Sequence, residues 1–179
     1  ETRITRYKFD SRDHAFESID PRLHAEQQTD ATLKPNFTFW TSLSGKVLRT
    51  DSVDSGSIVT LYDSAARRKL EVNALGVRRT WQYEDTTLPG RILNIRVQED
   101  AQEASIEERF VWATNTTPEH HQNLAGQCTY HYDRSGFNCI NSIAINGAQL
   151  SLSRYLIPEA EDALGQGPHG KDLQPETFT

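Results

Sequence analysis

The first candidate for chemistry is a group of acids around a histidine near the start of the chain: Asp10, Asp13, His14 and Glu17. Carboxylates beside an imidazole are the usual groups of general acid–base catalysis. Neighbouring positions in a strand or turn point to alternate faces, so we expect these side chains not to converge. We therefore interpret them as residues that cap a turn.

Three other groups resemble metal or nucleophile sites, and each lacks a necessary part. They are the His120-His121 pair, the group of Asp51, Asp54, Ser55 and Gly56, and Ser135 between Arg134 and Gly136. The histidine pair lies in a polar stretch where exposure to solvent is expected. The second group lacks the distant acid of a calcium loop, and the serine lacks the flanking pattern of a hydrolase nucleophile. The sequence therefore predicts no catalytic, cofactor-binding or metal-binding residue, and no enzyme.

Cys128 and Cys139 are the two cysteines of the chain, and they flank an expected hairpin turn. Two cysteines do not make a disulfide framework. No histidine or cysteine pair lies nearby at the spacing of zinc ligands. We interpret them as small buried thiols, and whether they pair stays open.

The tyrosines and tryptophans allow two interpretations. They could form a surface that binds carbohydrate or another aromatic-binding ligand. At strand spacing they are more typical of core or cross-strand packing, which we favour.

An aromatic residue, an acid and a turn recur along the chain, as in a repeat protein. The clearest instances are Tyr7 to Asp10, Thr60 to Asp63, Trp81 to Glu84 and Tyr130 to Asp133, with Phe37 to Gly45 in the same frame without the acid. Aligning Ser42, Asp63 and Glu84 gives two spacings of 21 residues. An acid at a strand end accepts backbone N–H bonds within a turn, and glycine supplies a positive φ. The acids are therefore predicted to make turns.

Alternation of apolar and polar residues predicts strands. They are expected at 37–39, 45–53, 58–62, 69–74, 91–97, 107–114, 130–132, 140–145 and 149–153. Asn146-Gly147 is the strongest hairpin signal, and Asp20-Pro21 and Thr117-Pro118 predict short helical turns. The predicted fold is all-β: antiparallel hairpins of degenerate repeats in a curved, extended sheet, with short helical turns and long loops.

Composition narrows the domain organisation and the classes of partner. The 179 residues suit one domain, assigned to 1–157, followed by an irregular, acidic, Pro- and Gly-rich excursion at 158–179. A net charge of −6 argues against nucleic acid as a partner. No apolar run reaches the roughly 18 residues of a membrane helix, so membrane insertion is not expected. The chain begins at Glu1 and holds no Met, so a processed product or fragment is expected, and no signal peptide is visible.

Several stretches resemble a known family. The aromatic–acid–turn units look like RHS/YD repeats. The stretches SIDPRL at 18–23, QYEDTTLPGR at 82–91 and ERFVWATNTTPEHHQNLAGQCTYHYD at 108–133 are similar to the N-terminal region of the C component of insecticidal toxin complexes, the TccC-like proteins. KPNF at 34–37 and VLRTDSV at 47–53 fit as well, and the resemblance runs from about Ile4 to Leu156.

The resemblance implies a function as part of a bacterial, secreted virulence complex. Members of the family form a hollow β-sheet shell with a B component, and the shell encloses an unfolded toxin that an A component delivers to a host cell. The self-cleaving and toxic regions of the family lie far downstream, and nothing of them is carried over to this chain. The implied partners are the B component and, through it, the A component, with self-association also possible.

The sequence departs from the repeat pattern at three turns. Asp13 and Ala66 stand where the repeat usually has glycine, and Glu84 replaces the usual repeat acid. Because Asp and Ala tolerate positive φ less well than glycine, we expect the tight-turn geometry to be weaker there.

Two function hypotheses remain. The first is a structural segment of the toxin shell that packs with the B component. The alternative is a stand-alone secreted YD-repeat module that binds, or acts as an effector on, a host or cell-surface ligand. A third, a small hydrolase or transferase, has no support from the residues.

Overall fold

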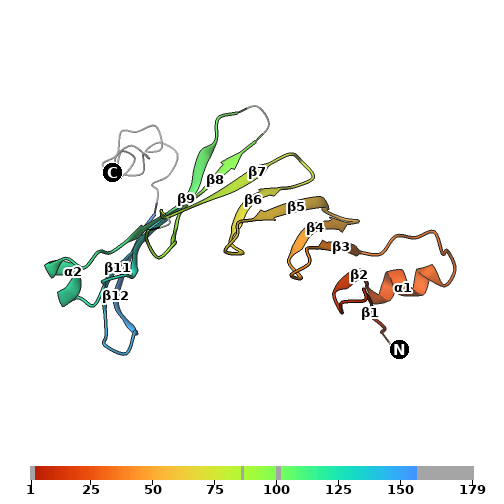
Figure 1. The fold of residues 1–179 in the computed structure, drawn as a ribbon, viewed down its shortest axis with the longest axis horizontal. Coiled ribbons are helices and arrows are strands. Elements are labelled where there is room, and N and C mark those ends of the chain that lie inside the picture. The colour runs from red at the N-terminus through yellow and green to blue at the C-terminus, as the bar shows by residue number, and fades with distance from the viewer. Residues whose placement is uncertain (1–2, 86, 100–101, 157–179) are drawn as a thin grey trace. The chain divides into compact units, whose positions relative to one another are not determined.

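The chain consists of antiparallel hairpins, as seen in a computed structural model that describes residues 3–85, 87–99 and 102–156 (Figure 1). Twelve strands of the described residues form one sheet, in which the hydrogen-bonded order equals the order along the chain. The sheet is open, with β1 and β12 as its edges. The predicted all-β fold of antiparallel hairpins is confirmed, and the predicted excursion at 158–179 lies outside the described residues.

The strand bounds agree with most of the ranges expected from alternation. They are β1 Arg6–Phe9, β2 Ala15–Ile19, β3 Phe37–Thr41, β4 Val47–Ser52, β5 Gly56–Tyr62, β6 Arg68–Val72, β7 Arg78–Tyr83, β8 Ile92–Gln98, β9 Ser105–Trp112, β10 Cys128–Asp133, β11 Gly136–Ile143 and β12 Gln149–Leu156. The strands β1, β2 and β7 lie outside the predicted ranges. β1 and β7 overlap the aromatic–acid units that begin at Tyr7 and Trp81, and the β2 sequence AFESI has no clear alternation.

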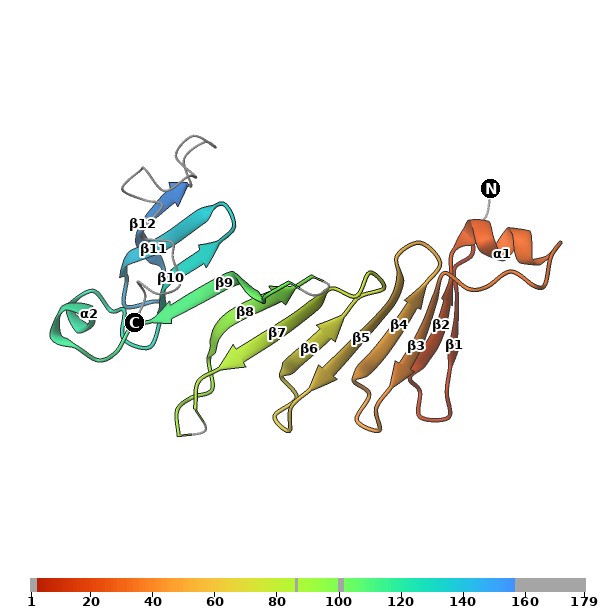
Figure 2. The same cartoon turned by 90° about the horizontal axis from the view of Figure 1, so that it is seen from above.

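The chain divides into two compact units, Glu1–Thr80 with Gln98–Glu103 and Trp81–Val97 with Ala104–Thr179. Within the first unit, β3 to β6 are paired in sequence order with short turns between them (Figure 2). Within the second, β9 to β12 pair in the same way, with a longer connection between β9 and β10.

Both helices begin where the sequence predicts. The helix α1, Pro21–Gln27, is capped by Asp20, whose carboxylate accepts the N–H of Leu23 at 2.8 Å. The helix α2, Thr117–His121, follows a capping box formed by Thr116 and Glu119. A proline in the first turn suits both, because its missing N–H would have no partner there.

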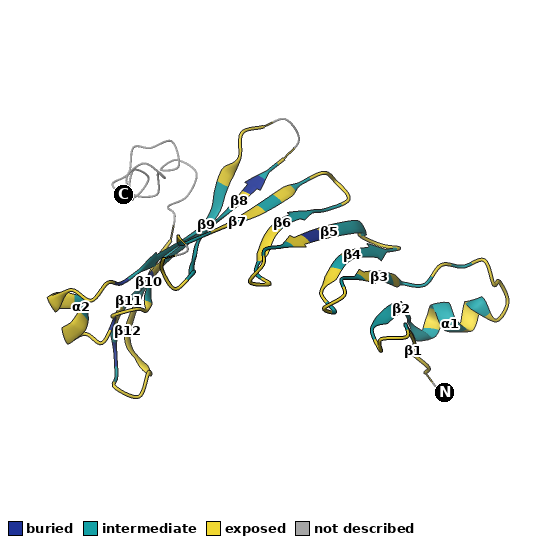
Figure 3. Ribbon diagram, viewed as in Figure 1, coloured by how far each residue is buried: buried dark blue, intermediate teal, exposed yellow. Residues whose placement is uncertain are grey.

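Burial is shallow across the described residues (Figure 3). No large side chain among them is less than 2% exposed. The small cluster that exists lies in the second unit, where Ala113, Leu124 and Ile143 pack together with Ile140. Many apolar side chains of the described strands are therefore exposed to solvent.

The residues of the NLAGQC stretch, 123–128, form the end of the connection between β9 and β10 and the first residue of β10, and they bind the connection to neighbouring residues. Asn123 takes a positive φ of 56°, and its side-chain amide donates to the carbonyl of Ile143 at 2.8 Å. Leu124 enters the cluster, and the N–H of Gly126 donates to the carbonyl of Ala113 at 3.0 Å. These residues hold the connection against the end of β11.

Candidate interaction surface

The acid–histidine cluster is a turn, as predicted, but two of its members do meet. The Asp10 carboxylate accepts the backbone N–H groups of Arg12 and His14 at 2.8 and 3.0 Å. These bonds, the one from His14 first, lower the pKa of Asp10 to about 2. The His14 ring lies 3.8 Å from the same carboxylate, so the expectation that no pair would converge is wrong here. Glu17 pairs instead with Lys8, on the neighbouring strand.

The same turn recurs among the described residues. In each copy, the N–H of the first residue donates to the carbonyl of the fifth residue. The N–H of the fourth residue donates to the carbonyl of the first, and all these bonds are 2.8–3.1 Å long. The turns start at Asp10, Ser42, Asp63, Asn73 and Ala144, and the fourth residue of each, Asp13, Gly45, Ala66, Gly76 and Gly147, has a φ between 60° and 85°. Two repeat acids, Asp10 and Asp63, start such turns and accept backbone N–H bonds within them, as predicted.

The expected weakening at the non-glycine turns is not seen. Asp13 and Ala66 adopt φ values of 65° and 60° and close the same two bonds as the glycine turns. At the third departure, Glu84 reaches across a longer loop to the N–H and guanidinium of Arg91. The backbone pattern of the turn thus persists without glycine, at a conformational cost in those residues.

The metal-like and nucleophile-like groups hold structural contacts. The rings of His120 and His121 are both exposed on α2. Asp51 is bound by the Arg49 guanidinium at 2.7 and 2.9 Å, and the Ser135 hydroxyl donates to Asp133 at 2.8 Å. Among the described residues, no three His, Cys, Asp or Glu side chains gather as metal ligands.

Cys128 and Cys139 lie on opposite faces of the β10–β11 pair and are free thiols. Cys139 is the partner of Tyr130 in the register. Cys128 lines a groove on the other face together with His131. Burial raises the pKa of the Cys128 thiol. Each thiol is only half-buried, so the interpretation as buried thiols is too strong.

One face of β10 to β12 has an aromatic cluster, defined here as Tyr130, Tyr132, Phe137 and Tyr155. The closest rings are Phe137 and Tyr155, with centroids 4.5 Å apart and planes 15° apart. Tyr132 lies 5.1 Å from Phe137 and 6.1 Å from Tyr130. These rings pack across neighbouring strands, which agrees with the favoured interpretation of the aromatics.

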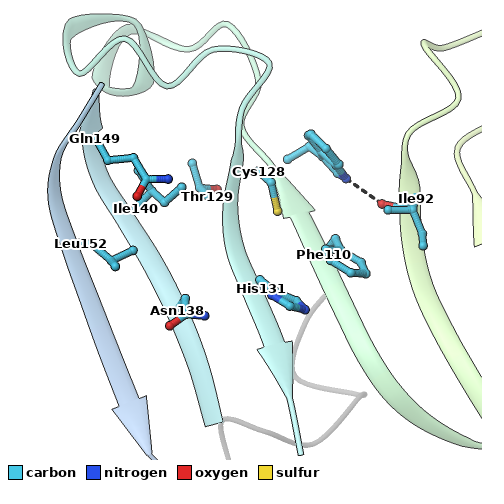
Figure 4. A pocket seen from close by; sticks show the side chains of 10 residues that line it. Ile92, Phe110, Cys128, Thr129, His131, Asn138, Ile140, Gln149 and Leu152 are labelled. Carbon is cyan, nitrogen blue, oxygen red and sulfur yellow. Dashed lines mark hydrogen bonds between the residues drawn. The ribbon is translucent and has the colours of Figure 1, made fainter. Parts of the chain in front are cut away.

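The opposite face has an apolar groove, which we call the β8–β12 groove (Figure 4). Its lining residues come from five consecutive strands: Ile92, Phe110, Trp112, Cys128, Thr129, His131, Asn138, Ile140, Gln149 and Leu152. The Phe110 and His131 rings stack at 4.5 Å, and the Trp112 indole N–H donates to the carbonyl of Ile92 at 2.7 Å. No site residue was predicted here. The alternation of the expected strand at 107–114 places Phe110 and Trp112 on one face, and both line the groove.

Apolar side chains are also exposed in the other described strands. Tyr7 and Phe9 of the edge strand β1 are 55% and 53% exposed, and Leu150 and Leu156 of the edge strand β12 are still more so. No helix in the described part of the chain is long and apolar enough to cross a membrane. The exposed apolar side chains of these strands can serve as a surface for protein–protein contact.

Comparison with known proteins identifies relatives over nearly the whole chain. Toxin subunit YenC1 of Yersinia entomophaga is 41% identical over 181 residues, which cover 99% of this chain and 19% of YenC1. Toxin subunit YenC2 of the same organism is 37% identical over 171 residues, covering 89% of this chain and 17% of YenC2. The chain thus spans about a fifth of the length of these relatives.

Solved structures of toxin complexes contain a region with a similar fold. A crystal structure of TcdB2-TccC3 matches with a TM-score of 0.79 and 44% identity, over 89% of this chain and 8% of the solved chain. A Photorhabdus luminescens Tc holotoxin pore matches with the same score and identity, over 7% of its chain. No family model matches the sequence. The chain is therefore homologous to the toxin subunits YenC1 and YenC2, and its structure is similar to TcdB2-TccC3 over most of its length.

Proposed function

We propose that this chain is a structural, non-enzymatic segment of a toxin-complex C component, which packs with a B component to enclose a toxin. The observation that carries the proposal is the shallow burial of the described strands, in a chain whose relatives are toxin subunits. A sheet that leaves apolar side chains exposed on its strands gains stability when another surface covers them. The same proposal includes an A component, which this chain would reach through the B component, and a secreted location for the complex.

The relatives support this partner class. The similar structures contain TccC3 solved together with TcdB2 or within a whole holotoxin. Those solved chains are much longer than this chain, which matches 7–8% of their length. The contact of this segment with a B component is therefore part of the proposal. Open edges at β1 and β12 offer unpaired backbone groups for further strands, which is how an edge of a sheet joins a neighbour.

Size-exclusion chromatography with and without a B component tests the proposal. The chain is mixed with TcdB2, or with the B component of its own complex, and co-elution is expected. A full-length relative such as YenC1 serves as competitor and should displace the chain if both use the same surface. A monodisperse chain with no affinity for either B component would contradict the shell role and favour the stand-alone binding module.

A further inference from the structure

We propose that a polar pocket on one face of β3 to β5 binds a saccharide, through hydroxyl groups on neighbouring carbons of the sugar ring. Three lining residues, Thr38, Asp51 and Ser57, are cross-strand partners on three consecutive strands (Figure 2). Opposed residues of antiparallel strands share a face, with Cβ atoms about 4.5–5.5 Å apart. The floor of the pocket is therefore a row of one hydroxyl, one carboxylate and a second hydroxyl.

The walls of this β3–β5 pocket come from two connections at the same end of the strands. Lys34 and Pro35 lie in the connection from α1 to β3, and Val53 lies in the turn from β4 to β5. The cavity measures about 450 Å³, within the roughly 300–1,000 Å³ of small-molecule sites. The pocket therefore has room for a sugar ring, and all its lining residues belong to the first compact unit.

The polar groups of the pocket have hydrogen-bonding capacity that the chain does not use. The Asp51 carboxylate accepts one bond on each oxygen from the Arg49 guanidinium, at 2.7 and 2.9 Å. A carboxylate has about four lone-pair sites, so about two remain. Within the described part of the chain, the Lys34 ammonium forms no ion pair, and the Thr38 and Ser57 hydroxyls form no side-chain hydrogen bond. Donors and acceptors thus lie side by side in the pocket.

This combination favours a saccharide over an ion. An anion would meet the Asp51 carboxylate in the middle of the floor, where like charges repel. A cation would meet the Lys34 ammonium and would compete with Arg49 for the carboxylate. A sugar hydroxyl donates to a carboxylate and accepts from an ammonium, so two neighbouring hydroxyls satisfy both groups. The ring of Pro35 and the side chain of Val53 offer apolar contact for the C–H bonds of the sugar.

An exposed tryptophan extends the site along the same face. Trp40 lies two residues after Thr38 on β3, so the two side chains share a face. The indole is 46% exposed, and the Arg49 guanidinium that binds Asp51 lies 4.9 Å from the ring centroid. A flat aromatic surface suits the C–H face of a sugar. The carbohydrate-binding interpretation of the aromatics therefore applies to Trp40, whereas the rings of the aromatic cluster on β10 to β12 pack against one another.

The test titrates the isotope-labelled 179-residue chain with the methyl glycosides of glucose, galactose and mannose, which differ in the orientation of their neighbouring hydroxyls. Amide shifts of Thr38, Asp51 and Ser57 in NMR spectra report on the pocket. For at least one glycoside these shifts should saturate with a Kd of about 1–10 mM, the affinity expected for so small a ligand.

Variants of the lining test the polar contacts. Thr38→Val combined with Ser57→Ala removes both floor hydroxyls and should weaken binding by about tenfold, because two hydrogen bonds are lost. Thr50→Val is the matched control, since Thr50 lies on β4 between Arg49 and Asp51 and points to the opposite face. It should change binding less than about twofold.

Lys34→Met keeps the test independent of the folding of the double variant, because Lys34 is exposed. It removes the ammonium, keeps most of the stem, and should weaken binding by about fivefold. No saturable shift with any of the three glycosides would overturn the proposal, as would equal losses in Thr50→Val and in the double variant.

Calcium chloride and sodium acetate, added separately to the native chain, distinguish a saccharide site from an ion site. A larger response of the same three amides to either salt than to the glycosides would assign the pocket to an ion and would also overturn the proposal. A chain that binds the B component yet ignores the glycosides would lose this inference alone, because the saccharide site does not depend on the role in a toxin shell.

Discussion

The turns after Tyr62-Asp63 and after Tyr132-Asp133 share a sequence signature but have different structural roles. Asp63 is bound within four residues, by the N–H groups of Ala65 and Arg67 and by the Arg67 guanidinium. Asp133 also caps its own turn, through Ser135 at 2.8 Å, but it is held as well by Arg154, 21 residues away on β12, at 2.9 and 3.0 Å. The contacts of Asp63 are therefore local to its turn, whereas those of Asp133 also connect the β10–β11 turn to β12.

The glycines repeat this contrast. A Cβ on Gly76, in a local turn, would meet nothing within 4 Å. A Cβ on Gly136, after Asp133, would lie 1.9 Å from the carbonyl oxygen of Tyr155. The shared repeat signature therefore specifies the turn, but it does not specify how closely the next strand packs against the turn.

The largest effect is expected for Gly136→Ala. The new methyl group would clash with the β12 backbone, which cannot yield as a flexible side chain does, so unfolding should become easier by about 3 kcal/mol. Gly76→Ala is the matched control, and its positive φ alone should cost about 1 kcal/mol. Urea unfolding followed by circular dichroism measures both. Equal losses would show that the two turns do not differ in their surroundings.

A smaller effect is expected for Arg154→Met. The guanidinium makes paired bonds to Asp133 and is the first cause of the lowered pKa of that carboxyl. Its loss should lower the melting temperature less than Gly136→Ala does, by loosening β12. Arg12→Met is the control, because Arg12 pairs with the nearby Asp10 at an exposed turn, where an ion pair contributes little. Thermal unfolding of both variants decides, and a larger loss for Arg12→Met would contradict the distinction.

Local features of this fold could be predicted from the sequence, and contacts between distant strands could not. Strands, turns and both helix starts follow from alternation, turn acids and Asp20-Pro21, because each depends on neighbours in the chain. The Asp133–Arg154 pairing and the groove do not, because they depend on which strands become adjacent and in what register. Phe110 and Trp112 share a face by alternation, but only the pairing of β9 with β10 puts His131 and Cys128 beside them.

A stabilising change is expected at Ala66. Its φ of 60° is unfavourable for alanine but not for glycine. Ala66→Gly should relieve that strain, partly offset by the greater freedom of glycine in the unfolded chain, for a net gain of about 0.5 kcal/mol. Asp13→Gly should gain less, because aspartate tolerates this conformation better. Urea unfolding of the two variants gives the comparison, and destabilisation by Ala66→Gly would show that the turn is not strained.

The smallest effect at neutral pH is expected for Asp10→Asn. Asn73 occupies the equivalent position of another turn and accepts the same two backbone bonds, at 3.0 Å each, so an amide serves there. The carboxylate differs in its titration: its pKa is lowered to about 2 from the ordinary 3.8. A lowered folded-state pKa stabilises the protein above about pH 4 and loses that contribution as the pH falls toward about 2.

The advantage of the native chain over Asp10→Asn should therefore shrink as the pH falls from 4 to 2, and urea unfolding at pH 7, 4 and 2.5 measures it. The reverse change, Asn73→Asp, should create the same pH dependence in a turn that lacks a carboxylate, because the two N–H groups that bind Asn73 would then hold an anion. If both variants leave the pH profile of unfolding unchanged, the turn carboxylates are interchangeable with amides at every pH. In that case the recurrence of acids in these turns would have to come from their tolerance of turn geometry, which asparagine shares, and charge would play no part in it.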